Sequence, residues 1–75
     1  MTIQVFTITD ENGRDCSNCT ATKRAMDKQG ISYEAREMTA AEREAFKAAG
    51  LLSAPVVVTD QETWAGFRPD KILSL

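Results

Sequence analysis

The stretch Cys16-Ser17-Asn18-Cys19 decides the fold that this chain is expected to adopt. An apolar run at residues 3–8 precedes it and predicts a β-strand, while residues 20–29 follow without glycine or proline and predict a helix. A C-x-x-C motif in this context, in a chain without a secretion signal, is typical of a dithiol–disulfide redox centre. The chain has only these two cysteines and no histidine, so the motif is the first candidate for a functional site.

The composition limits how the chain is organised and what it binds. Its 75 residues suffice for one domain, residues 1–75, and leave no room for a second core. The net charge of −2 offers no basic stripe for nucleic acid and no attraction to a membrane surface. No apolar run approaches the ~18 residues of a spanning helix, and the first residues lack the pattern of a signal peptide. We therefore expect a cytoplasmic monomer whose lone disulfide is catalytic rather than structural.

The rest of the chain predicts the element order βαβαββα. The first helix begins at Cys16 and ends before Gly30, which suits the residue after a helix. The other predicted elements are a polar turn at 10–15, a strand at 31–37, a helix from the capping box Thr39–Glu42 to Gly50, strands at 56–58 and 63–65, and a last helix at 69–75.

Residue spacing predicts which side chains are buried. In the first helix, Cys19, Thr22 and Met26 recur at helical spacing and share an inward face. The charged residues between them are expected to face water; they are Lys23, Arg24, Asp27 and Lys28. The strand at 31–37 alternates around Tyr33 and Ala35, and the second helix has an apolar side made of Ala41, Ala45, Phe46 and Ala49.

Three separate motifs give the chain a resemblance to a known family. They are CSNCTATKRAM at residues 16–26, Ser53-Ala54-Pro55-Val56-Val57, and WAGFRPD at residues 64–70, which is close to a W-S-G-F-R-P-D signature. In this order they resemble the thioredoxin superfamily and, within it, the glutaredoxin-like NrdH-redoxins. The resemblance implies a thioredoxin/glutaredoxin-like α/β fold, with a four-stranded mixed sheet flanked by three helices. Strands 1 and 2 would pair in parallel, and strands 3 and 4 would form an antiparallel hairpin.

The same resemblance implies a function and its partners. Such proteins donate electrons to ribonucleotide reductase, are re-reduced with NADPH by thioredoxin reductase, and hold no cofactor or metal. It also implies a cis Ala54–Pro55 bond beside Cys16, and a partner-binding surface that comprises Ser53, Ala54, Pro55, Trp64, Gly66, Phe67 and Arg68. The chain departs from the family between Phe6-Thr7 and Cys16, where its loop is several residues longer. Because this loop lies on the active-site face, the difference concerns which partners bind.

Residue chemistry gives the two thiols different roles. Cys16 is the predicted nucleophile, because unpaired N–H groups and the macrodipole at a helix start favour a thiolate. Cys19 lies one turn further in and is predicted to resolve the mixed disulfide. Asp15 is expected to tune the pKa of Cys16: its charge raises that pKa, it would support the helix as an N-cap, and Arg14 offsets the charge. The expected balance is a pKa moderately below that of a free thiol.

Alternatives stay open for the function and for single residues. A glutathione-dependent glutaredoxin is the first, although Phe67 and Pro69 replace the small residue and the N–H donor with which such proteins commonly hold glutathione. A metal-bridged dimer or non-catalytic binding module is the second, because two cysteines form half of a structural zinc site. Pro55 could be an ordinary trans proline, and Trp64 could serve only to pack the core.

Overall fold

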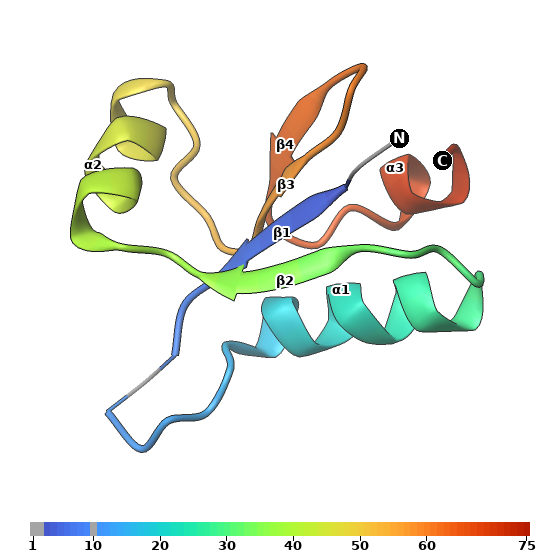
Figure 1. The fold of residues 1–75 in the computed structure, drawn as a ribbon, viewed down its shortest axis with the longest axis horizontal. Coiled ribbons are helices and arrows are strands. Elements are labelled where there is room, and N and C mark those ends of the chain that lie inside the picture. Colours follow the sequence, from blue (N-terminus) through green and yellow to red (C-terminus); the bar gives the residue numbers. More distant parts are fainter. Residues whose placement is uncertain (1–2, 10) are drawn as a thin grey trace.

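The chain folds in the predicted order βαβαββα, and Figure 1 shows its helices arranged around a central sheet. The structure is a computed structural model and describes residues 3–9 and 11–75. Asp10, the first residue of the predicted polar turn, lies outside the described residues. The elements are β1 (Gln4–Thr7), α1 (Ser17–Lys28), β2 (Glu34–Glu37), α2 (Ala40–Ala48), β3 (Val56–Val58), β4 (Thr63–Ala65) and α3 (Pro69–Leu73).

The sheet is mixed and has the strand order β2-β1-β3-β4. Val5 in β1 lies opposite Ala35 in the parallel strand β2 and opposite Val57 in the antiparallel strand β3. Val57 in turn lies opposite Trp64 in β4, which completes the predicted hairpin. Since β1 is an inner strand, three of its four residues are buried: Val5, Phe6 and Thr7.

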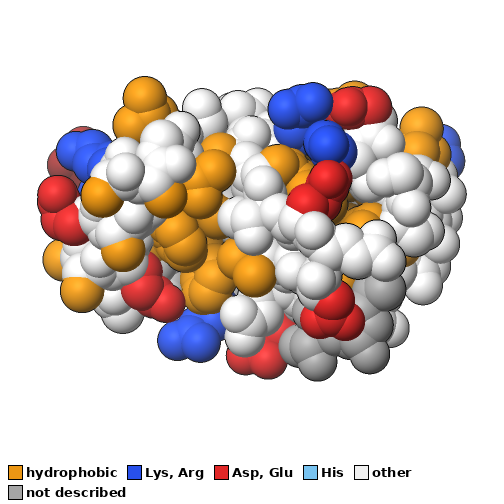
Figure 2. Space-filling view, turned by 90° about the horizontal axis from the view of Figure 1, so that it is seen from above, with side chains coloured by type: hydrophobic (Ala, Val, Ile, Leu, Met, Phe, Trp, Pro, Cys, Tyr) orange, Lys and Arg blue, Asp and Glu red, His pale blue; other side chains and the backbone are white. Residues whose placement is uncertain are grey.

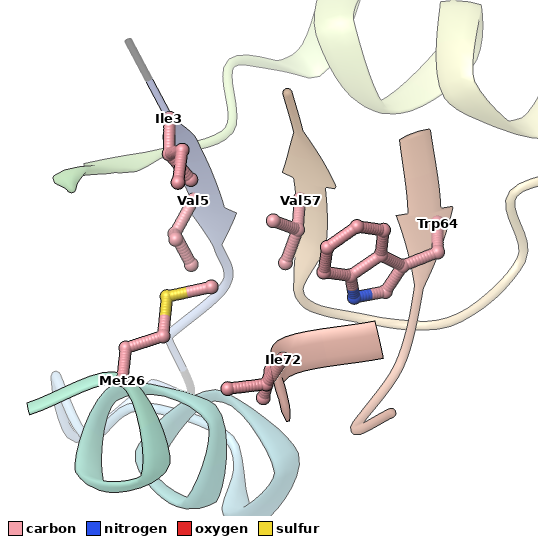
Figure 3. Close-up of a cluster of buried hydrophobic side chains, with 6 residues drawn as sticks. All are labelled: Ile3, Val5, Met26, Val57, Trp64 and Ile72. Atoms are coloured by element: carbon pink, nitrogen blue, oxygen red, sulfur yellow. The ribbon is translucent and has the colours of Figure 1, made fainter. Parts of the chain in front are cut away.

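The core joins the sheet to the helices on one of its faces. α1 and α3 pack against each other on that face, whereas α2 lies toward the other side (Figures 1 and 3). Figure 3 shows the core cluster that fills this interface: Ile3, Val5, Met26, Val57, Trp64 and Ile72. Burial of an aliphatic side chain of this size stabilises the fold by roughly 1.5–3 kcal/mol. Met26 is fully buried, which confirms the predicted inward face of α1.

Strand β2 differs from the prediction in length and in burial. It spans only Glu34–Glu37, and all of its residues are exposed, including Ala35. The alternating pattern predicted a half-buried strand, but β2 is an edge strand at the end of the sheet. Its charged residues suit that position, because charge on an edge discourages pairing with another chain. β1 is also shorter than predicted and spans only Gln4–Thr7. α3 ends at Leu73, because the last two residues make only the tighter i→i+3 hydrogen bonds.

Helix α2 begins at the predicted capping box but does not bury its apolar side. The Thr39 hydroxyl accepts from the Glu42 N–H at 3.1 Å, and the Glu42 carboxylate accepts from the Thr39 N–H at 2.9 Å. This last bond is the main reason why the pKa of Glu42 is lowered. Of the predicted apolar side only Phe46 is even half-buried, with its ring centroid 5.2 Å from that of Phe6. The alanines stay exposed because their methyl groups do not reach the sheet as a phenyl ring does.

Candidate functional site

The two cysteines form a disulfide at the N-terminus of α1. Their Cα atoms are 5.1 Å apart, so the C-x-x-C spacing closes within one helical turn. Cys16 is the N-cap residue, with φ −62° and ψ 156°, and its Sγ accepts the backbone N–H of Cys19 at 3.0 Å. Asp15 is therefore not the N-cap, which corrects one of the two roles predicted for it. A sulfur that accepts an amide N–H at a helix start is placed where a thiolate is stabilised.

The two sulfurs differ in their access to solvent. Cys19 is completely buried, whereas Cys16 is partly exposed. A hollow of about 250 Å³ opens beside Cys16. Its lining residues follow β1 or lead into α1: Ile8, Thr9, Arg14, Asp15, Cys16 and Ser17. An incoming sulfur can thus reach Cys16 from this side, and the predicted difference in shielding between the two cysteines is confirmed.

The loop before the motif is closed at its base. Thr9 and Asp15 form an antiparallel bridge, and the Cys16 N–H donates to the Ile8 carbonyl at 3.2 Å. Residues 11–14 project from the molecule (Figure 1), while Cys16 is held close to the end of β1. Gly13 has the positive φ, 77°, that the predicted Asn-Gly turn requires. Arg14 and Asp15 of this loop line the hollow beside Cys16.

Asp15 has a partner that was not expected from the sequence. The ammonium group of Lys23 donates a hydrogen bond to Asp15 Oδ2 and forms an ion pair with it. Lys23 was predicted to face water together with the other charged residues of α1, but its side chain is only 28% exposed. Asp15 precedes the N-cap and lies outside the helix, so its spacing from Lys23 did not indicate the pair.

The second and third motifs meet in space, as Ser53 and Pro55 both lie next to Gly66. The Gly66 N–H donates to the Pro55 carbonyl at 2.8 Å, and the Ala54–Pro55 bond is cis, as the resemblance implied. Gly66 has φ +82°, and a Cβ added there would lie 3.4 Å from the Cβ of Ser53. Glycine is required here by the positive φ, while a Cβ at this position would come into van der Waals contact with Ser53.

The other predicted partner-binding residues separate into a core residue and a surface turn. Trp64 is only 4% exposed and belongs to the core cluster, which favours the alternative that it serves to pack the core. Phe67 is 38% exposed, and Arg68 pairs with Asp70 at 3.1 Å. Hydrogen bonds from Arg68 are the main reason why the pKa of Asp70 is lowered. The surface turn therefore presents an aromatic ring and an internally paired carboxylate.

A second hollow lies between α2 and the loop that carries Ser53 and Ala54. It holds about 330 Å³, and its lining mixes apolar and charged side chains: Ile8, Met38, Arg43, Glu44, Lys47, Leu51, Leu52, Ser53 and Ala54. Figure 2 shows hydrophobic side chains gathered in the hollowed surface beside α2, which lies to the left. Leu52 is 77% exposed on this loop. The surface next to Ala54 thus combines apolar contact area with charge.

Gly66→Ala is expected to impair reduction of a partner as well as stability. Forcing a Cβ into a positive-φ position costs about 1–2 kcal/mol, and the new methyl group would also touch Ser53. Gly30→Ala is the matched control, because Gly30 has φ +71° with nothing near its missing Cβ. Both variants should lose similar stability in thermal melts, but only Gly66→Ala should slow disulfide exchange, by a factor of ~3–10. Equal exchange rates would show that Ser53 does not depend on this glycine.

Two features associated with other functions were also sought in the described part of the chain. Among residues 3–9 and 11–75 no group of three or more metal-ligating side chains lies together. None of the helices formed by these residues has the length and apolar character needed to cross a bilayer.

Comparison with known proteins places these motifs in a wider context. The glutaredoxin family profile matches residues 3–64. The glutaredoxin-like protein NrdH of Escherichia coli K12 is 40% identical over 67 residues, which are 87% of this chain and 83% of that protein. Its namesake in Salmonella typhimurium is 35% identical over 69 residues, covering 89% and 85%. The solved structure of E. coli NrdH-redoxin, described as glutaredoxin-like with a thioredoxin-like activity profile, matches with TM-score 0.86 and 38% identity over 100% of this chain and 95% of that one.

Proposed function

Because this chain belongs to the glutaredoxin family and within it to the NrdH redoxins, thiol–disulfide redox proteins with a C-x-x-C active site, we propose that it donates electrons to ribonucleotide reductase. The observation that carries the proposal is the Cys16–Cys19 disulfide at the start of α1, in which Cys16 is partly exposed and Cys19 is buried. Such a pair can exist as a dithiol or as a disulfide without rearrangement of the helix. It can therefore accept electrons from one protein and deliver them to another.

The reaction follows from the positions of the two sulfurs. In the reduced protein the Cys16 thiolate attacks one sulfur of the partner's disulfide; that S–S bond breaks, a mixed disulfide forms, and the released partner thiolate takes up a proton. Cys19 then loses its proton and attacks Cys16 Sγ, which forms the Cys16–Cys19 disulfide and releases the second partner thiol. Two electrons and two protons pass to the partner. A thioredoxin reductase restores the dithiol with electrons from NADPH.

The loop around Ala54 is proposed to hold the partner segment during this exchange. No hydrogen bond among residues 3–9 and 11–75 uses the backbone of Ala54, which is partly exposed. An extended segment carrying the partner's disulfide can pair with these backbone groups, as in the addition of a strand to a sheet. Pro55 would pack beside Cys16 in this arrangement, with Ser53 and Gly66 supporting the loop and Phe67 and Arg68 extending the contact surface. The hollow between α2 and Ala54 provides room for the segment's side chains.

Reconstitution of the electron chain tests this proposal. We expect purified protein, NADPH, a thioredoxin reductase and a ribonucleotide reductase to form deoxyribonucleotide with matching NADPH oxidation. Omitting the protein should abolish both signals. A small dithiol that supports the ribonucleotide reductase directly is the positive control for that enzyme. If the dithiol works and the reduced protein does not, ribonucleotide reductase is not the acceptor.

A further inference from the structure

The ion pair between Asp15 and Lys23 involves the residue next to the proposed nucleophile, and Asp15 lines the same hollow as Cys16. Asp15 precedes Cys16 in the chain, and Lys23 follows Cys16 by two helical turns on the same side of α1. Long helical side chains lean toward the N-terminus of their helix, so Lys23 extends back along α1 to the carboxylate. The two side chains are 28% and 27% exposed. The pair is therefore held in a partly desolvated position, where charges act more strongly than on an open surface.

The charge of Asp15 opposes the reaction unless it is neutralised. A carboxylate next to a thiol disfavours the thiolate by like-charge repulsion, against the favourable effect of the helix start. Other charges also face this region: Arg14 lines the same hollow as Cys16, and Glu37 of β2 accepts a hydrogen bond from Thr9 at 2.6 Å. Lys23 is joined to Asp15 Oδ2 by a hydrogen bond and an ion pair. It supplies the positive charge that offsets Asp15.

We propose that Lys23 is a positioning residue, which holds and neutralises the Asp15 carboxylate so that the Cys16 thiolate can form. The inference rests on the proposed role of Cys16 as nucleophile. It assigns to Lys23 an effect on reactivity, beyond fastening the loop at residues 9–15 to α1. The two effects are separable, because fastening changes stability, whereas neutralisation changes the titration of Cys16.

Titration in a single-cysteine protein tests the proposal. In the Cys19→Ala background only Cys16 contributes thiolate absorbance, and its backbone hydrogen bond from residue 19 is retained. Lys23→Met should raise the Cys16 pKa by about half a unit or more, because Asp15 is then unpaired. Lys23→Arg should keep the parent value. Asp15→Asn should lower the pKa by a similar amount, and the double variant Asp15→Asn/Lys23→Met should return close to the parent.

The controls separate this inference from a structural role and from the proposed function. Lys28→Met removes the same charge from the exposed far end of α1 and should leave the pKa unchanged. If Lys23→Met lowers the melting temperature and the Cys16 pKa does not move, the pair only fastens the loop and the inference is wrong. Trapping of an oxidised partner on the same variants is a separate readout. If the Cys19→Ala parent traps no partner, the proposed function fails, while the titration still decides the role of Lys23.

Discussion

Cys19→Ser is expected to accumulate a mixed disulfide with an oxidised partner, and Cys16→Ser to form none and to reduce the partner no faster than the uncatalysed background. The reason is access: Cys16 is partly exposed beside a hollow, whereas Cys19 is fully buried. With Cys16 present and Cys19 replaced, the first exchange proceeds and no internal thiol can complete the second. Non-reducing electrophoresis and mass spectrometry of the trapped complex measure the outcome.

Two further measurements check that the different access of the two cysteines is the cause of this result. Serine places a hydroxyl in the buried site of Cys19, so Cys19→Ala should give the same trapped complex without that cost. In the reduced parent protein, Cys16 should be alkylated much faster than Cys19. Equal alkylation rates, or a complex trapped through Cys19, would reverse the assignment of the two thiols.

Thioredoxin reductase is expected to reduce the oxidised protein rapidly, and glutathione at least ~10-fold more slowly. The redox potential of the protein does not decide which donor reduces it. Thioredoxin lies near −270 mV and glutaredoxins near −200 to −230 mV. Because about 30 mV is worth only ~1.4 kcal/mol, both donors remain feasible anywhere in this range. The rate of reduction must therefore depend on how well the protein binds each donor. In the turn that would hold glutathione, Phe67 fills space, Pro69 has no N–H to donate, and the Asp70 carboxylate is paired with Arg68.

The test compares NADPH oxidation with thioredoxin reductase and with glutathione plus its own reductase. Phe67→Ala should weaken reduction by thioredoxin reductase about fivefold, equivalent to ~1 kcal/mol at an apolar contact. Leu73→Ala is the matched control, because Leu73 is another exposed apolar residue, on α3. If millimolar glutathione reduces the protein as fast as the reductase does, the glutaredoxin alternative replaces the NrdH-type function.

Parts of the site were predictable because they depend on neighbouring residues. Cys16 and Cys19 are separated by one helical turn, so their positions at the start and on the inner face of α1 follow from helical geometry. The capping box of α2 is equally local, since both of its hydrogen bonds join Thr39 to Glu42. By contrast, the pairing of Asp15 with Lys23 depends on how the longer loop enters the helix. Charge spacing alone left Lys23 indistinguishable from the exposed charges of α1.

The sequence by itself determined the order of the elements, the position of the redox pair and the membership of the family, because these depend on hydrophobic period, caps and motifs. Only the tertiary structure decided that Trp64 lies in the core, that β2 and α2 remain exposed, and that Gly66 meets Pro55 and the Ser53 loop. The physical reason is the distance along the chain between the residues that interact. Caps and helical faces arise from hydrogen bonds and contacts within a few residues, whereas these later features depend on sheet order and on loops that bring distant segments together.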